Sequence, residues 1–376
     1  MNTDDIVRTF LDFYRERGHE LITGSSLLPP SSDPVLFTTS GMHPLTLYLQ
    51  GRPHPQGRRL VNVQRCLRTT DLDEIGDLTH LTVFEMLGSW SLGDYSHPQS
   101  LRWGYELLRD GFGIPREKLY VTVFGGDEQV GPDLESLDTW RELGVPVEST
   151  QDENWWSNGP VGPCGPDSEI FFWTGDGPPE GTPTSDSRWV EIWNHVHMRY
   201  ERGEDGGLVP LRQVNVDTGM GLERLVSVLQ GRRSVYETDL FEPWMRTVPL
   251  LWDLDERSVR VVCDHLRSSV VVLEEGVRPS NTGRGYVVRR LIRRLLMVLW
   301  RGDDSRTLSD LPGEFVGTGT VRGVLLDEER RFSQLLVRGR RVLSRPEFRG
   351  PLSEEDYRYL HDTHGLPREW VGSVLR

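Results

Sequence analysis

The spacing of apolar residues changes along this 376-residue chain, and the change constrains its fold more than any other feature. Up to Tyr236, short apolar or alternating runs have the composition and length of β-strands. These runs are residues 35–37, 60–63, 83–86, 119–124, 169–172, 190–193 and 213–216. Only some of them are separated by helix-length segments. We therefore expect an α+β fold, with helices flanking an antiparallel sheet, rather than a regular parallel α/β fold.

Helical periodicity replaces the strand pattern after residue 240. It runs through residues 240–300 and again through residues 320–345. The change predicts a domain boundary near residue 245, with an α+β domain at 1–244 and a smaller all-α domain at 245–376. A further helix is expected at the N-terminus, over residues 3–18, with Thr3 as its cap and Gly18 at its end.

Composition excludes several classes of protein. No stretch approaches the roughly 20 apolar residues that a membrane helix requires, and the acidic start is unlike a signal peptide, so we expect a cytoplasmic protein. The three cysteines, Cys66, Cys164 and Cys263, are too few and too widely spaced for a disulfide framework or a zinc site. Because the formal net charge is −14, any surface for nucleic acid must be local.

Three separated segments carry the most specific pattern in the chain. The first joins residues 24–29 to 33–42, the second joins 64–68 to 84–95, and the third is the run from Asp217 to Arg224. In this order they resemble the three signature motifs of class II aminoacyl-tRNA synthetases in their alanine-specific form. The resemblance covers about residues 4–370 and implies the antiparallel sheet of that class.

The implied chemistry joins an amino-acid carboxylate to the α-phosphate of ATP, and two anions need fixed positive charge between them. Arginine suits this task because it is always charged and donates in a fork. The resemblance implies catalytic roles for Arg68, which would bridge carboxylate and phosphate, and for Arg224, which would lie against the adenine. Phe84 would stack on the other adenine face, with Glu85 and Met86 completing the ATP site. Mg²⁺ is expected with the phosphates, and no side chain is assigned to it.

The amino-acid pocket follows from the same resemblance. Asp217 would bind the ammonium group, and Gly219 beside it allows close approach of the backbone. Trp156, Asn194 and Val196 align with the residues that line the pocket for the side chain. Such a pocket selects alanine, but glycine and serine remain competitors because one methylene is worth only about 1–3 kcal/mol.

Two histidines, His195 and His197, share one face of a predicted strand. No third ligand lies nearby in the sequence. We therefore interpret both as ordinary strand side chains rather than as metal ligands.

The C-terminal part resembles the start of the family's tRNA-recognition domain. There the resemblance implies that Asn281 and Asp362 read the G·U wobble pair of the acceptor stem. A predicted helix here carries an apolar stripe on one side, made of Val287, Val288, Leu291, Ile292, Leu295 and Leu296. Its other side holds the candidates for phosphate contact, which are Arg289, Arg290, Arg293 and Arg294.

The chain departs from the family pattern at two places. After Arg68 it has only Thr69 and Thr70 where the family has a Gly-Gly-Lys-His-Asn stretch, so the loop lysine is missing, as is an arginine expected near His80. The family's editing and dimerisation domains are expected beyond the last residue and are not present, which predicts a monomer. Both departures affect the tRNA side more than the adenylate side.

Three functions follow as hypotheses. The first is ATP-dependent activation of alanine, or a similarly small amino acid, with transfer to the acceptor end of tRNA. The second makes the same adenylate but transfers the amino acid to a small molecule or carrier in a biosynthetic pathway. The third is a non-catalytic tRNA-binding paralogue, which the presence of Arg68, Asp217 and Arg224 disfavours.

Overall fold

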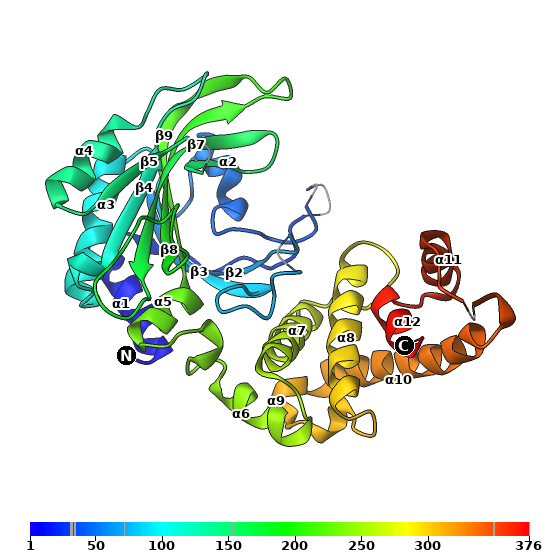
Figure 1. Ribbon diagram of the computed structural model, residues 1–376. Helices are drawn as coiled ribbons and strands as arrows, with labels where there is room; N and C mark the ends of the chain where they lie inside the picture. The colour runs from blue at the N-terminus through cyan, green and yellow to red at the C-terminus, as the bar shows by residue number, and fades with distance from the viewer. Residues whose placement is uncertain (31–32, 34, 71, 152, 349, 376) are drawn as a thin grey trace. The chain divides into compact units, whose positions relative to one another are not determined.

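The computed structural model describes residues 1–30, 33, 35–70, 72–151, 153–348 and 350–375. Pro34 of the first motif segment and Asp71, which lies between the two parts of the second, are outside these residues. The chain forms two compact units (Figure 1). Unit 1 consists of Met1–Glu74 and Leu78–Pro243, and unit 2 consists of Ile75–Asp77 and Trp244–Arg376.

Unit 1 is built on a nine-stranded sheet with the order β1-β2-β3-β9-β8-β7-β4-β5, and β6 pairs with β7. The strands are β1 Glu20–Leu21, β2 Arg59–Leu67, β3 Val83–Ser91, β4 Leu119–Phe124, β5 Val147–Thr150, β6 Trp155–Ser157, β7 Gly162–Trp173, β8 Trp189–Arg202 and β9 Leu208–Gly221. All pairs are antiparallel except β1 with β2 and β4 with β5. The predicted α+β class with an antiparallel sheet is therefore confirmed.

One predicted strand is wrong. Residues 35–37 form bends, with Val35 and Leu36 exposed and only Phe37 buried. The apolar run has no sheet face to cover, and the prolines just before it, Pro29 and Pro30, cannot donate to a strand ladder. The next residue, Thr38, donates its N–H to the Leu27 carbonyl at 2.9 Å, and its carbonyl accepts from the Leu67 N–H at 2.9 Å.

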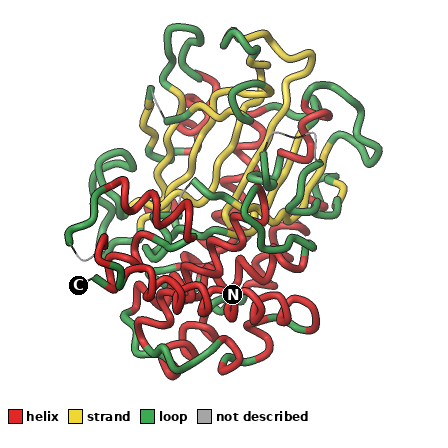
Figure 2. The backbone as a smooth tube through the Cα atoms, turned by 90° about the vertical axis from the view of Figure 1, so that its right-hand side faces the viewer, coloured by secondary structure: helices red, strands yellow, loops and turns green. Residues whose placement is uncertain are grey.

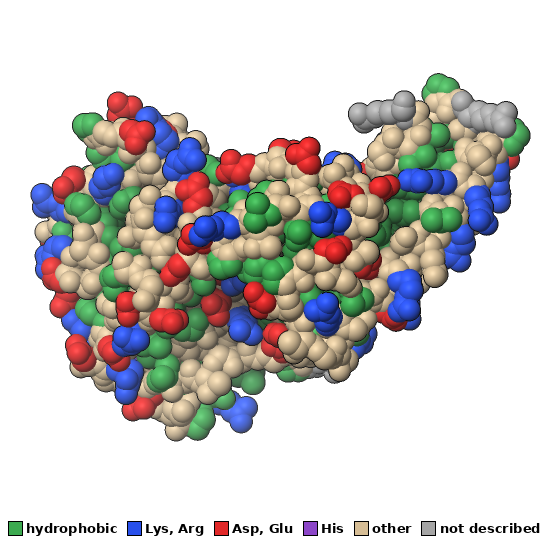
Figure 3. Space-filling model, turned by 90° about the horizontal axis from the view of Figure 1, so that it is seen from below, with side chains coloured by type: hydrophobic (Ala, Val, Ile, Leu, Met, Phe, Trp, Pro, Cys, Tyr) green, Lys and Arg blue, Asp and Glu red, His purple; other side chains and the backbone are tan. Residues whose placement is uncertain are grey.

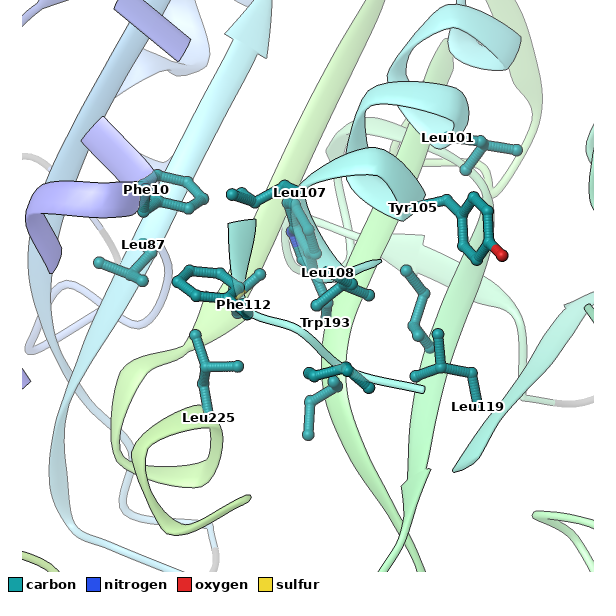
Figure 4. Packing of buried hydrophobic residues seen from close by; sticks show 14 of the residues in the cluster. Phe10, Leu87, Leu101, Tyr105, Leu107, Leu108, Phe112, Leu119, Trp193 and Leu225 are labelled. Atoms are coloured by element: carbon teal, nitrogen blue, oxygen red, sulfur yellow. The ribbon is translucent and has the colours of Figure 1, made fainter. Parts of the chain in front are cut away.

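Helices cover one face of the sheet and enclose the larger core. They are α1 Thr3–Arg15, α3 His97–Glu106, α4 Leu134–Leu143 and α5 Leu222–Leu229. Figure 4 shows this core, in which Phe10 of α1, Leu87 of β3 and Trp193 of β8 meet Leu225 of α5. The N-terminal helix was predicted correctly, but Asn2 caps it by accepting from the Asp5 N–H, and it ends at Arg15. Thr3 instead bonds to Asp239.

The other face of the sheet carries a smaller apolar cluster and the site described below. This cluster includes Leu45, Trp90, Val196 and Met198, all buried. Side chains alternate between the two faces of a sheet, and Trp90 and Val196 are cross-strand partners of Asp217. The strand residues of this cluster therefore lie on the same face as Asp217 and Gly219. One face of the sheet is thus a packed core, and the other is available for chemistry.

Unit 2 consists of helices and loops among its described residues (Figure 2). Its helices include α7 Glu256–Glu274, α8 Gly283–Gly302, α9 Gly313–Val316, α10 Gly319–Leu343, α11 Glu354–His364 and α12 Arg368–Val374, and α6 Glu242–Leu251 leads into it. The apolar stripe predicted for α8 is buried, which includes Val288, Leu291 and Leu295. No helix in the described part of the chain is long and apolar enough to cross a membrane.

Candidate active site

A cavity of about 240 Å³ opens on the less covered face of the sheet in unit 1. Of the residues predicted for nucleotide and amino acid, it gathers all except Glu85, namely Arg68, Phe84, Met86, Trp156, Asn194, Val196, Asp217, Gly219 and Arg224. These residues come from segments spread over more than 150 positions of the sequence. Their convergence therefore results from the sheet rather than from local sequence.

Strand register places the centre of the cavity. Asp217 and Gly219 alternate along β9, and Val196 and Asn194 lie directly opposite them on β8. On the other side of β9, Gly88 of β3 pairs with Gly219. A Cβ on Gly219 would lie 2.7 Å from the Met86 Sδ, so this position has to be glycine if Met86 is to lie across it.

Glu85 lies on the opposite side of β3 from Phe84 and Met86, as strand alternation requires. Its carboxylate is 3.6 Å from Arg65. Its backbone N–H donates to the Glu223 carboxylate, at 3.1 and 3.3 Å. Glu223 itself lines the cavity and was not predicted, so the backbone of Glu85, rather than its side chain, connects it to the site.

Arg68 is held by the two motif segments that flank it. Its Nε donates to the Thr39 carbonyl at 3.1 Å, and its guanidinium lies over the Phe84 ring, 5.1 Å from the ring centroid. This cation–π contact keeps the planar guanidinium at the cavity wall. The two residues predicted for phosphate and adenine are thus in direct contact.

Arg224 lies in the first turn of α5 and reaches back to β8. Its Nη1 donates to the Glu191 carbonyl at 3.1 Å and to the Glu191 carboxylate at 3.0 Å. Glu191 was not among the predicted site residues, although it lies in the same strand as Asn194. The ion pair fixes Arg224 at one end of the cavity.

Asp217 is buried at the centre of the site. Burial raises the pKa of its carboxyl group to about 7, although a hydrogen bond from Trp90 opposes the rise. The Trp90 indole N–H donates to the Asp217 Oδ1 at 2.6 Å. Near neutral pH this carboxyl group is therefore divided between its charged and neutral forms.

Further carboxyl groups lie beside Asp217. Glu169 lines the cavity, where burial and the negative charge of Glu191 raise its pKa to about 9. Asp167 is buried behind Asn194, and burial raises its pKa to about 7. It accepts one hydrogen bond from Asn154, at 2.9 Å, and one from Asn194, at 3.2 Å. These acids were missed because their proximity depends on the pairing of β7 with β8.

Comparison with known proteins agrees with this geometry. The family described as "tRNA synthetases class II (A)" matches residues 5–302. The chain belongs to the class II tRNA synthetase family. It is 41% identical to the alanine–tRNA ligase of Treponema pallidum, over the whole chain and 68% of that protein. It is 40% identical to that of Rubrobacter xylanophilus, over the whole chain and 47% of that protein.

Among solved structures, the apo histidyl-tRNA synthetase of S. aureus is similar over 61% of this synthetase chain and 65% of its own length. That likeness has 12% sequence identity and a TM-score of 0.40. The family assignment rests on the sequence matches, and the relatives that carry it are alanine–tRNA ligases.

A histidine cluster lies on the helix-covered face of the synthetase sheet. His97 of α3 stacks on His197 of β8, with ring centroids 4.7 Å apart and planes 17° apart. Candidate ligand atoms of His97, His197 and Asp133 lie within 4.8 Å of one another, so the fold brings together partners that the sequence kept apart. The nearly parallel rings direct their lone pairs along parallel planes, which suits packing better than convergence on one ion.

That cluster is tied together by hydrogen bonds. One nitrogen of His97 lies 3.2 Å from the His195 carbonyl, and the other lies 3.0 Å from the Ser136 hydroxyl. The Ser136 hydroxyl donates to Asp133 at 2.6 Å, and a His195 nitrogen lies 3.1 Å from the Ser100 hydroxyl. Burial lowers the pKa of His197 to about 2, so its ring is neutral.

The arginines predicted for phosphate contact on α8 of this synthetase differ in their surroundings. Arg289 and Arg293 both pair with Glu328 of α10, at 3.2 and 2.8 Å, and the Glu328 side chain is only 2% exposed. Arg290 points to the surface. The predicted basic face is therefore partly an internal ion-pair network.

The two predicted base-reading residues lie on the surface of unit 2. Asn281 accepts a hydrogen bond from the Arg289 guanidinium, and Asp362 lies 2.9 Å from the His361 ring nitrogen. Both side chains are exposed. On the face that Figure 3 shows, acidic and basic side chains are interspersed over most of the surface.

Proposed function

We propose that this chain activates alanine with ATP to form alanyl-adenylate and pyrophosphate. One observation carries the proposal: Asp217 and Arg68 line the same small cavity. A buried carboxylate and an arginine are the complementary partners of the two charged ends of an amino acid. The family membership and the alanine–tRNA ligase relatives support the same reading.

In the proposed reaction, Asp217 holds the substrate ammonium group and Arg68 holds the carboxylate against the α-phosphate. Arg68 also offsets the negative charge that develops as the carboxylate attacks and pyrophosphate leaves. Arg224 and Phe84 hold the adenine between them. Each of these groups acts by binding and orientation, because the reaction needs alignment of two anions rather than a proton acceptor.

The acidic pair Glu169 and Glu191 fits a divalent cation. The pKa of Glu169 is raised partly by the charge of Glu191. A cation between the two carboxylates would therefore offset their mutual repulsion. Carboxylate oxygens are ligands that Mg²⁺ prefers. Mg²⁺ bound there would neutralise phosphate charge during activation.

The size of the site supports a small substrate. Trp156, Val196 and Met86 line the cavity, and Met86 fills the space that Gly219 leaves open. These walls leave room for a methyl group. Discrimination against glycine or serine by such a pocket is about 1–3 kcal/mol, so both are expected as weaker substrates.

For the acceptor we propose the 3′ end of tRNA. In this proposal residues 1–244 are the catalytic domain and residues 245–376 the tRNA-recognition domain of a cytoplasmic monomer. Asn281 and Asp362 are exposed and available to a base pair, and Arg290 is available to a phosphate. The relatives that match the chain are named alanine–tRNA ligases, which supports the same acceptor.

A second candidate is transfer of the activated alanine to a small molecule or carrier. Its support is the pairing of Arg289 and Arg293 with Glu328, which removes two cations from a phosphate-binding face. The short Thr69–Thr70 connection and the net charge of −14 favour it too.

Two assays test these proposals in sequence. Alanine-dependent exchange of pyrophosphate into ATP should be present in the wild type and lost in Asp217→Ala, while the surface control Asp12→Ala should retain it. Charging of purified tRNA should then occur and should fall in Asn281→Ala. Exchange without any charging would select the second candidate, and absence of exchange would overturn activation itself.

A further inference from the structure

A buried indole stands directly behind the carboxylate assigned to the substrate ammonium group. Trp90 of β3 and Asp217 of β9 are cross-strand partners in the antiparallel register. The Trp90 N–H donates to the Asp217 Oδ1 at 2.6 Å. Trp90 is fully buried, and Asp217 is 6% exposed. Trp90 was not among the residues predicted for the site.

The fold makes dedicated room for this indole. A Cβ on Gly88 would lie 2.1 Å from the Trp90 ring, and a Cβ on Gly41 would lie 3.0 Å from it. Val196 and Met198 belong to the apolar cluster that contains the ring. Because the ring is enclosed by glycine backbone and apolar side chains, its N–H has a fixed position.

The indole acts on Asp217 in two opposing ways. Its ring is part of the apolar surroundings that remove water from the carboxyl group, which favours the neutral acid. Its N–H donates to the charged form and favours the carboxylate, and this bond lowers the pKa that burial raises. The N–H also engages Oδ1 and leaves Oδ2 as the oxygen for a ligand.

We propose that Trp90 is a positioning residue for amino-acid activation, which holds the Asp217 carboxylate in the orientation that receives the substrate ammonium group and favours its charged form. The inference rests on the proposed function. Trp90 does not line the cavity itself and acts through Asp217 alone.

The test is Trp90→Phe, which keeps the aromatic ring and removes the N–H. In alanine-dependent pyrophosphate exchange, the KM for alanine should rise about tenfold at pH 7, because a hydrogen bond to a charged group is lost. The KM for ATP and the kcat should stay near wild type, since the ammonium contact is present in ground and transition states alike. The acidic limb of kcat/KM for alanine should move up by about one pH unit.

The other ionisable groups that line the cavity are the same in the wild type and in Trp90→Phe, and they are Arg68, His80, Glu169, Glu191, Glu223 and Arg224. A displaced acidic limb therefore reports on Asp217. The matched control is Trp173→Phe, which removes the N–H of another buried tryptophan, bonded to the Gly177 carbonyl at 3.3 Å. If Trp90 had only a structural role, Trp90→Phe and Trp173→Phe would change the KM for alanine alike, and the acidic limb of kcat/KM would stay at its wild-type pH.

Gly41→Ala provides a second variant should Trp90→Phe not fold. Its Cβ would lie 3.0 Å from the Trp90 ring, which must shift by a few tenths of an ångström, and 3.4 Å from the Met86 Sδ, which is ordinary contact. A smaller rise in the KM for alanine, with an unchanged KM for ATP, is expected. If the wild type exchanges normally and both folded variants match it, the inference is overturned while the proposed function stands. If the wild type shows no exchange, the proposed function itself fails.

Discussion

Arg224 and Glu191 form a two-point contact, in which one guanidinium nitrogen donates to both the backbone carbonyl and the carboxylate of the same residue, at 3.1 and 3.0 Å. The contact joins the first turn of α5 to β8. Through this contact Glu191 holds Arg224, the arginine proposed to bind ATP. Because Glu191 is also one of the two carboxylates proposed to bind Mg²⁺, one substitution at Glu191 should affect both the arginine and the cation site.

Glu191→Gln should reduce pyrophosphate exchange by about tenfold to a hundredfold, because a charge-assisted hydrogen bond contributes about 1.5–3 kcal/mol. The KM for ATP and the Mg²⁺ concentration for half-maximal rate should both rise. Steady-state exchange at several Mg²⁺ concentrations measures this. Glu201→Gln, on the same strand but outside the cavity, is the control and should behave as wild type. Equal behaviour of the two variants would contradict the assignment of Glu191.

The pH dependence of alanine use should follow Asp217. Burial raises the pKa of this carboxyl group to about 7, so it is charged above that pH and neutral below it. Only the charged form attracts an ammonium group, so kcat/KM for alanine should fall as pH falls through 7 and approach a tenfold loss per unit below it. The profile should be measured at saturating ATP and Mg²⁺. A flat profile between pH 6 and 8 would contradict the prediction that titration of Asp217 controls alanine binding in this range.

Gly219→Ala should alter amino-acid choice more than nucleotide binding. The new methyl group would lie 2.7 Å from the Met86 Sδ, and the flexible methionine must move into the cavity. The KM for alanine should rise several-fold more than the KM for glycine, and the KM for ATP should rise less than that for alanine, although Met86 is also predicted for the ATP site. Gly131→Ala is the control, because a Cβ there meets nothing within 4 Å. If alanine and glycine were affected equally, Gly219 would not border the side-chain pocket.

The arginines of α8 should separate into two groups by experiment. Arg293→Ala removes a partner of buried Glu328 and a cation over the Phe332 ring, so it should lower the free energy of unfolding by about 1–3 kcal/mol. Arg290→Ala should change stability by less than about 0.5 kcal/mol, because its side chain is exposed.

Charging assays extend this comparison. If tRNA is the acceptor, Arg290→Ala should raise the KM for tRNA several-fold and lower the salt dependence of binding by about one ion. Thermal unfolding and charging of both variants measure the two effects. Normal charging by Arg290→Ala at every salt concentration would remove this residue from the phosphate contacts.

The sequence was sufficient for residues whose function depends on identity within a motif. Arg68, Asp217 and Arg224 could be found in this way, and the structure gathers them in one cavity. Residues whose role depends on which strands pair were missed. Glu169 becomes a neighbour of Asn194 only through the β7–β8 register, and Trp90 meets Asp217 only because β3 pairs with β9.

A break in the alternation of side chains along β8 is another reason why some site residues were not predicted from the sequence. Glu191 and Ile192 are consecutive, and a regular strand would send them to opposite faces, yet both line the cavity. The pairing of β7 with β8 is irregular here, since Ile170 pairs with Trp193 and Phe171 with Glu191. Such a bulge leaves no mark in the alternation of apolar residues. The strand predicted at 35–37 was wrong for a similar reason, because an apolar run alone does not show whether the chain has a neighbouring strand to pair with.

The irregularity at Ile192 divides β8 into two segments with separate constraints. In the proposed function, Glu191 before it belongs to the nucleotide end, and Asn194 and Val196 after it belong to the amino-acid end. A bulge bends its strand and re-aims the side chains next to it. If the proposed function holds, substitutions at Asn194 or Val196 would reshape the amino-acid end of the site and leave in place the strand segment that carries Glu191 and, through it, Arg224.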